Sequence, residues 1–158
     1  MSKYLNRLNI GMIICEEYSE INGRLANISG IKDKVELDSD GRATFALICD
    51  FNFIEFEIPK GVDVLSFRFF IRTIGEKPAY IIPFMISEMG ISEQVNGVMT
   101  HQVSVMLNVD KFSFPQKGNY AIEIYKNYGH IDERKESKNI EYYRKNENFV
   151  NAINFAIV

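Results

Sequence analysis

The side chains that could do chemistry in this sequence are few and stand far apart. There are two histidines, His101 and His130, and two cysteines, Cys15 and Cys49. A zinc site, a Ser-His-Asp triad or a Cys-His pair would need one of these histidines, yet neither cysteine has a histidine nearby, and HExxH, CxxC and GxSxG motifs are absent. We therefore predict that the protein is not an enzyme and has no catalytic residue, no cofactor and no metal site.

Acidic side chains offer the remaining chemistry. The run Asp38-Ser39-Asp40-Gly41 has oxygen ligands that suit calcium, but Cys49 stands at the twelfth position, where an EF-hand loop needs a glutamate. Loops could still gather Asp33, Asp38, Asp40 and Asp132, and loop carboxylates could serve a hydrolase. A simple Asp-Gly turn at residues 38–41 is the interpretation that we favour.

Length, charge and cysteine use narrow the class of protein. A chain of 158 residues with 46% hydrophobic and 25% charged residues is typical of one globular domain, here residues 1–158. The net charge of −3 and the lack of a basic cluster argue against nucleic acid as a partner. No apolar run is long enough to cross a membrane. Both cysteines lie in apolar runs, which indicates buried free thiols in a reducing cytoplasm, although a disulfide stays open if their strands are neighbours.

The elements around these residues alternate apolar and polar side chains with a period of two. In the clearest case, Leu65, Phe67, Phe69 and Ile71 alternate with polar residues, as on a strand with one buried face. Strands are predicted over residues 8–16, 24–31, 43–53, 64–74, 80–86, 103–109, 120–124 and 149–158. This pattern predicts an all-β fold: an antiparallel two-sheet sandwich of seven or eight strands, immunoglobulin-like or C2-like. A polar insertion near the C-terminus, residues 131–148, fits a hairpin and a short surface helix equally.

Three positions predict local irregularity. Asn22-Gly23 is typical of a tight hairpin turn. The apolar phase flips after Phe53, so a bulge or bend is expected near Phe53-Ile54. Pro83 cannot donate a hydrogen bond to a neighbouring strand, so its strand is at an edge or is bulged there.

Several strands carry apolar residues on the face that should be wet. These residues are Ile48, Phe70, Met85, Met106 and Tyr125. Either a third layer, for example the 131–148 segment, covers them, or they form an exposed face that contacts a partner protein or a second copy of the chain.

The turn and strand pattern also carries a family resemblance. It includes Cys15-Glu16-Glu17, Asn22-Gly23-Arg24-Leu25, Ile28-Ser29-Gly30-Ile31, Phe114-Pro115, and Gly118-Asn119-Tyr120 with Glu123. Over residues 8–125 the chain resembles a family of small bacterial β-sandwich proteins known only as a domain of unknown function. The resemblance implies a fold and no catalytic residues, and the charged segment after Gly129 departs from it.

The expectation for function is a non-enzymatic binding module that contacts another protein or itself. One alternative is a carbohydrate- or lipid-binding sandwich with Phe and Tyr in its loops, although the absence of Trp makes sugar stacking less favourable. The other alternative is a hydrolase with loop carboxylates. Two or more titratable groups that converge in one pocket would favour the hydrolase.

Overall fold

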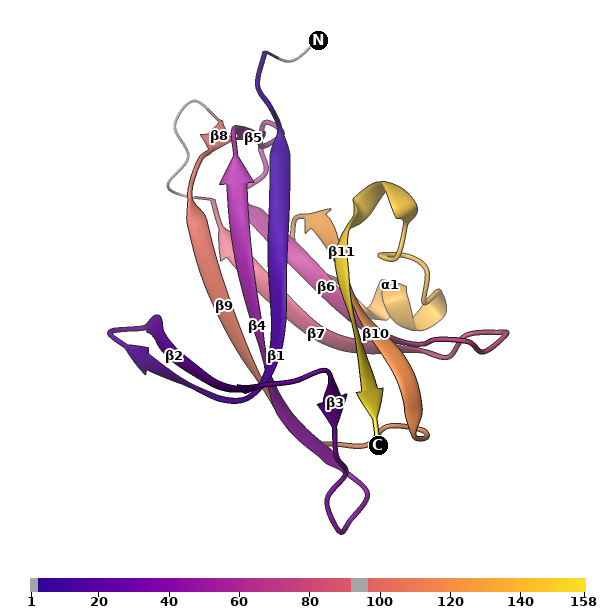
Figure 1. The fold of residues 1–158 in the computed structure, drawn as a ribbon. Helices are drawn as coiled ribbons and strands as arrows, with labels where there is room; N and C mark the ends of the chain where they lie inside the picture. Colours follow the sequence, from indigo (N-terminus) through magenta and orange to yellow (C-terminus); the bar gives the residue numbers. More distant parts are fainter. Residues whose placement is uncertain (1–2, 92–96) are drawn as a thin grey trace.

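The computed structural model describes residues 3–91 and 97–158 and shows an all-β fold (Figure 1). Sheet A has the strand order β2-β1-β4-β9, with β1 at Arg7–Ile21, β2 at Arg24–Ile31, β4 at Ala43–Ile54 and β9 at Gln102–Phe112. Sheet B has the order β3-β11-β10-β6-β7, with β3 at Lys34–Val35, β6 at Val64–Thr73, β7 at Ile81–Gly90, β10 at Gly118–Tyr128 and β11 at Phe149–Ile157. Two short strands, β5 (Phe56–Glu57) and β8 (Val98–Met99), form a small third sheet.

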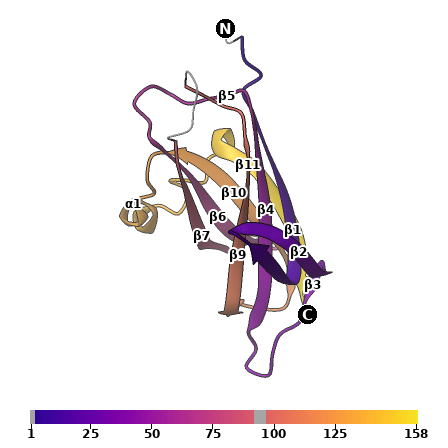
Figure 2. The ribbon, with the colours of Figure 1, turned by 90° about the vertical axis from the view of Figure 1, so that its left-hand side faces the viewer.

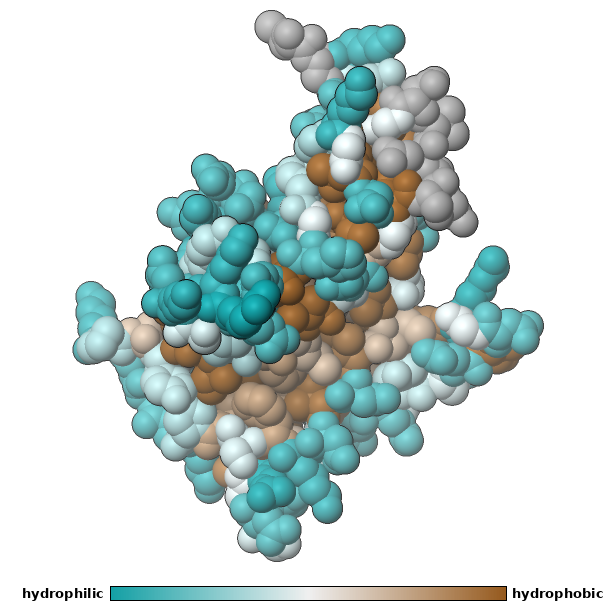
Figure 3. Space-filling view, turned by 180° about the vertical axis from the view of Figure 1, so that it is seen from behind, coloured by the Kyte–Doolittle hydropathy of each residue, from teal (hydrophilic) through white to brown (hydrophobic). Residues whose placement is uncertain are grey.

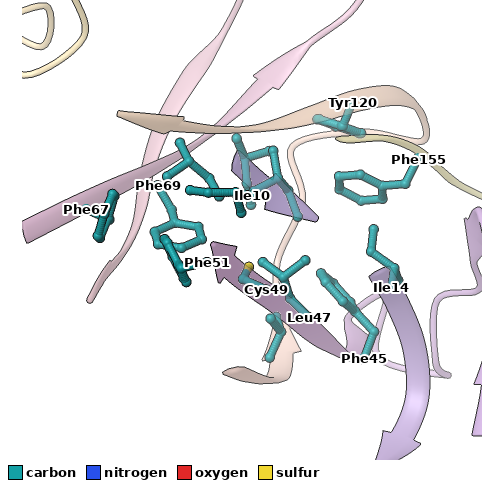
Figure 4. Packing of buried hydrophobic residues seen from close by; sticks show 14 of the residues in the cluster. Ile10, Ile14, Phe45, Leu47, Cys49, Phe51, Phe67, Phe69, Tyr120 and Phe155 are labelled. Carbon is teal, nitrogen blue, oxygen red and sulfur yellow. The ribbon is translucent and has the colours of Figure 1, made fainter. Parts of the chain in front are cut away.

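The main core lies between sheets A and B (Figure 4). Alternate residues of β4 and β6 point into it, so that Phe51 and Phe67 meet with ring centroids 4.6 Å apart. Phe45 of β4 likewise meets Phe155 of β11, at 5.8 Å. Each buried Phe side chain contributes about 1.5–3 kcal/mol of hydrophobic stabilisation. The alternate apolar residues seen in the sequence therefore stabilise the packing of sheet A on sheet B.

The two sheets approach each other most closely along one side. On that side β1 and β11 lie next to each other (Figures 1 and 2). The side-chain amide of Asn151 in β11 donates a hydrogen bond to the backbone carbonyl of Ile10 in β1. On the other side, β9 ends sheet A and β7 ends sheet B. One aromatic contact, between Phe84 and Phe112 at 5.4 Å, joins them there. We call this β7–β9 side the open side.

The expected irregularities are confirmed. Asn22 and Gly23 have φ values of 53° and 76°, as a tight hairpin turn requires. The chain bends at Glu55, whose φ is 45°, between β4 and β5. Pro83 lies in the end strand of sheet B, where the register with β6 shifts opposite Phe69 and Phe70. Both expected features of the proline strand, an edge and a bulge, are therefore present.

Other expectations need correction. The strand predicted over residues 80–86 extends to Gly90. The sequence predicts a loop over residues 88–96, but Glu88 is in the strand, and residues 92–96 lie outside the described residues. The pairing is not wholly antiparallel, because β3 pairs with β11 in parallel. The first strand continues to Ile21, since its C-terminal half pairs with β2 in a long hairpin.

The polar insertion is helical. Residues 131–148, which we call the arm, contain α1 (Glu133–Lys138) and a short 3-10 helix η1 (Asn146–Asn148). The carboxylate of Asp132 accepts a hydrogen bond from the backbone N–H of Arg134 and caps α1. The arm lies beside sheet B, on the side away from sheet A (Figure 2).

Candidate functional site

The arm covers two of the five residues that were candidates for a partner-contact face. Phe70 and Tyr125 pack edge to face on the outer side of sheet B, with ring centroids 5.7 Å apart. The arm packs on these two rings through Tyr143, Ile131 and Ile140, and Phe70 and Tyr125 are both buried. Of the two alternatives that the sequence allows for Phe70 and Tyr125, a covering layer or an exposed face, the structure shows the covering layer.

The β1–β2 hairpin covers two more of these residues. Ile48 is buried on the outer side of sheet A, in a cluster that includes Leu25 and Ile28 of β2. Met106 of β9 is partly buried in the same cluster. Two layers on opposite faces of the fold thus account for four of the five residues.

Met85 belongs to the main core. The bulge in β7 at Pro83 and Phe84 changes the phase of the strand, so that Met85 packs on the core rather than pointing to the outer face. Ile48, Phe70, Met85, Met106 and Tyr125 therefore do not form one exposed face, and that expectation is corrected.

Ion pairs fasten the arm to sheet B. The guanidinium of Arg68 donates two hydrogen bonds to the carboxylate of Glu136, one of them from Nε to Oε2 at 2.8 Å, and both residues are about 95% buried, with exposures of 6% and 5%. Glu123 of β10 accepts hydrogen bonds from Arg72 of β6, at 3.0 Å, and from Arg144 of the arm, at 2.8 Å. Each buried charge is paired, as burial requires.

The histidines and loop acids do not converge. His130 lies 2.9 Å from the carboxylate of Glu88 in an exposed pair, whereas His101 packs near the ring of Phe53. The Asp38 carboxylate accepts hydrogen bonds from the backbone N–H groups of Asp40 and Arg42, as the predicted turn requires. Within residues 3–91 and 97–158, no three His, Cys, Asp or Glu side chains come together as metal ligands would.

The two cysteines are buried free thiols on opposite faces of sheet A. Cys49 packs in the main core, while Cys15 packs in the cluster under the hairpin. Burial, together with the nearby charge of Asp50, raises the pKa of Cys49 from 9.0 to about 12, and burial also raises the pKa of Cys15. Both thiols are therefore poor nucleophiles near neutral pH.

The open side is the remaining candidate site. Core-facing residues of the inner strands β4 and β6, such as Leu47 and Phe67, are fully buried, whereas most of those of β7 and β9 are only partly buried, Val109 being the exception. The partly buried set includes Ile82, Phe84, Met85, Met89, Val103, Val105 and Leu107. Figure 3 shows apolar side chains gathered across the middle of the face seen from behind. Part of the core is thus accessible along this side.

The backbone of β9 offers hydrogen-bonding groups there. The N–H of Phe53 donates to the carbonyl of His101, so in the unbroken register the odd-numbered residues of β9 bond to β4. The N–H and C=O groups of the residues in between then point away from β4, toward the edge to which no strand of residues 3–91 or 97–158 bonds, which we call the free edge. These residues are Gln102, Ser104, Met106 and Asn108.

From Gln102 to Val109 the edge of β9 lacks the features that usually protect an edge strand, and charges and a register shift follow only at Asp110 and Lys111. From Gln102 to Val109 it contains no charged residue and no proline. The other end strands differ: β7 carries Pro83 and a bulge, and β3 has two residues. In the sequence, the uncharged run was visible, but it indicated only a strand, because nothing in one sequence tells an edge strand from an inner one.

An acidic hollow adjoins this edge. Glu16, Glu17, Tyr18 and Glu20 of β1 and Asn108 of β9 line a space of about 310 Å³. Asn108 donates a hydrogen bond to the Tyr18 hydroxyl at 3.0 Å, which fixes the hairpin beside β9. Glu16 pairs with Lys32, whereas Glu17 and Glu20 have no ion-pair partner among the described residues.

Comparison with known proteins gives no match. No family model matches the chain, and neither a curated protein nor a solved structure is significantly similar to it. The likeness to small bacterial β-sandwich proteins therefore stays a prediction. None of the helices in the described part of the chain has the length and apolar character needed to cross a bilayer.

Proposed function

We propose that the protein is a non-enzymatic binding module that takes up an extended segment of another protein along the free edge of β9. The observation that carries this proposal is the coincidence of two features on the open side: a long unprotected edge and partly exposed core residues beside it. In strand addition, backbone hydrogen bonds supply affinity and alternate side chains enter apolar sites. Both parts of such a site are present here.

The added strand would complete sheet A and cover the core. Residues of the partner that point inward would pack on Val105 and Leu107 of β9 and toward Phe84 of β7. β7 itself is a poor acceptor, because Pro83 has no N–H and the bulge breaks the regular pattern there. The partner segment therefore bonds to β9 alone.

The proposal also includes the class of the fold and the location of the protein in the cell. We describe sheets A and B as an immunoglobulin-like or C2-like sandwich that is closed along β1 and β11. Two buried thiols on opposite faces of one sheet suit a reducing compartment, which supports a cytoplasmic protein. Buried thiols and dispersed histidines favour binding over catalysis.

The test uses proline at an edge-facing position. In Ser104→Pro the lost N–H points away from β4, so the fold should persist while one bond to the partner is removed. Ser104→Ala is the matched control, because it loses the hydroxyl bond to Asp50 but keeps the N–H. Thermal unfolding of both variants should show midpoints close to each other.

Complexes should then be isolated from the native organism and analysed by native mass spectrometry. We expect a stoichiometric partner with the wild type and Ser104→Ala, and its loss with Ser104→Pro. In the complex, hydrogen exchange should slow at the amides of Gln102, Ser104, Met106 and Asn108. A partner that stays bound to Ser104→Pro, or unchanged exchange at these amides, would contradict strand addition.

A further inference from the structure

The surroundings of the β9 edge also indicate which kind of segment it takes. We infer, on the basis of the proposed function, that the partner strand alternates apolar and basic residues, with its apolar side chains toward the core and its Lys or Arg side chains on the outer side of sheet A. The inference depends on where charge lies around the edge. It goes beyond strand addition, which by itself requires no charge in the partner.

The inward positions of the partner meet only apolar surface. A strand paired with Gln102–Val109 spans about 26 Å at roughly 3.3 Å per residue. Its inward side chains would lie beside Val103, Val105 and Leu107, which are core-facing residues of β9 that remain partly exposed. Toward Phe112 the site ends, because Phe84, Phe112 and Phe114 form a chain of edge-to-face contacts. Apolar side chains at alternate positions fit this surface.

The outward positions meet acidic groups. On the outer side of sheet A, Asp50 lies opposite Ser104 and accepts a hydrogen bond from its hydroxyl. At the level of Asn108, the hollow presents Glu17 and Glu20 without partners among the described residues. An outward Lys or Arg of the partner near Asn108 would complement these two carboxylates. An acidic side chain there would be repelled.

The same charges disfavour a second copy of the chain as the occupant. In a two-fold pairing of β9 with β9, the outer faces of both sheets would be continuous, and the carboxylates of the two copies would lie on one surface. The chain has a net charge of −3, so general attraction between copies is also lacking. A basic segment of another protein relieves this accumulation of like charge, whereas a second copy increases it.

Synthetic peptides provide the test. Three fluorescein-labelled octapeptides carry Val at alternate positions and Lys, Gln or Glu at the positions between, and their binding is followed by fluorescence anisotropy. We expect the Lys peptide to bind at least about tenfold more tightly than the Gln peptide, with affinity that falls as salt rises, and the Glu peptide not to bind. The Ser104→Pro variant should bind none of them.

Two double variants test whether Glu17 and Glu20 account for the preference for the Lys peptide. Glu17→Gln/Glu20→Gln should weaken the Lys peptide about five- to tenfold and leave the Gln peptide unchanged, since exposed ion pairs contribute modestly. Asp40→Asn/Glu147→Gln changes the net charge equally at the 38–41 turn and in η1, so it should leave both peptides unchanged.

The results distinguish a failure of the basic-partner inference from a failure of the strand-addition proposal. If all three peptides bind the wild type equally and Ser104→Pro binds none, strand addition holds and the basic partner is wrong. If the protein dimerises and Ser104→Pro abolishes the dimer, the occupant is a second copy and the basic partner is again wrong. If no peptide binds, or Ser104→Pro binds as the wild type does, both the inference and the proposed function are contradicted.

Discussion

Replacing Glu136 by glutamine should show how firmly the arm is attached to sheet B. Arg68 and Glu136 form a two-bond ion pair in which both side chains are about 95% buried. The Glu136→Gln side chain would keep its shape and one acceptor but would leave the Arg68 guanidinium without its counter-charge. Breaking one partner of such a pair costs about 3–5 kcal/mol, and the retained acceptor places the expected loss near the lower limit.

The loss can be measured by urea unfolding followed through tyrosine fluorescence, since the chain has 8 Tyr and no Trp. For a small domain the free energy of unfolding falls by about 1–3 kcal/mol per M urea. A loss of about 3 kcal/mol should therefore lower the midpoint by roughly 1–3 M. If the arm detaches before the sheets unfold, hydrogen exchange should show the loss first in residues 131–148.

A double variant tests the reasoning. Arg68→Met/Glu136→Met removes both charges and keeps apolar volume at both positions, so it should be more stable than Glu136→Gln. The losses of unfolding free energy in the single variants Arg68→Met and Glu136→Met should then add up to more than the loss in the double variant. If the free energy of unfolding of Glu136→Gln stays within about 0.5 kcal/mol of the wild-type value, for both the sheets and the arm, the Arg68–Glu136 pair is not a buried ion pair that stabilises the fold.

Two further predictions concern single positions. Because the pKa of Cys49 is raised from 9.0 to about 12 in the folded protein, stability is full below pH 9 and should fall as the pH rises from 9 toward 12. Cys49→Ala should show a shallower fall over that window in a pH series of urea unfolding, and equal slopes would contradict the shift. Gly30→Ala should cost about 1–3 kcal/mol, because Gly30 has a φ of 68° and a new Cβ would lie 2.7 Å from Cγ of Glu16. Gly23→Ala, at a position with a φ of 76° but open space around the new Cβ, should cost less in the same assay.

The strands could be predicted from the sequence because their signal is local. Alternation over Leu65–Ile71 reflects one buried face, and the phase flip after Phe53 is visible without any knowledge of neighbours. The edge or bulge at Pro83 follows from backbone chemistry alone, because proline has no N–H to donate. Such features depend on a few adjacent residues.

The sequence offers residues 131–148 as one possible cover of the outer faces, but the choice between a cover and an exposed face could not be made, because it depends on distant partners. The arm has no apolar stripe, so its attachment through Glu136 shows only when Arg68, 68 residues away along the chain, is placed beneath it. Met85 lies on the core side and not on the outer face because the strand phase changes at the bulge near Phe84; Pro83 predicts an edge or a bulge, and only the bulge turns Met85 inward. The open side was missed because strand order is a property of the whole fold.

The contrast between the end strands of the two sheets supports a binding function more than any single residue does. β3 has two residues and β7 is interrupted at Pro83, whereas β9 keeps a regular register with β4 from Gln102 to Val109. The short length of β3 and the interruption of β7 limit unwanted pairing. If pairing were harmful at β9, a lysine at Ser104 or a proline at Met106 would prevent it without disturbing the bonds to β4. An edge that stays uncharged over eight residues, beside a sheet B whose end strands are short or interrupted, is what a protein needs to accept one strand on the open side.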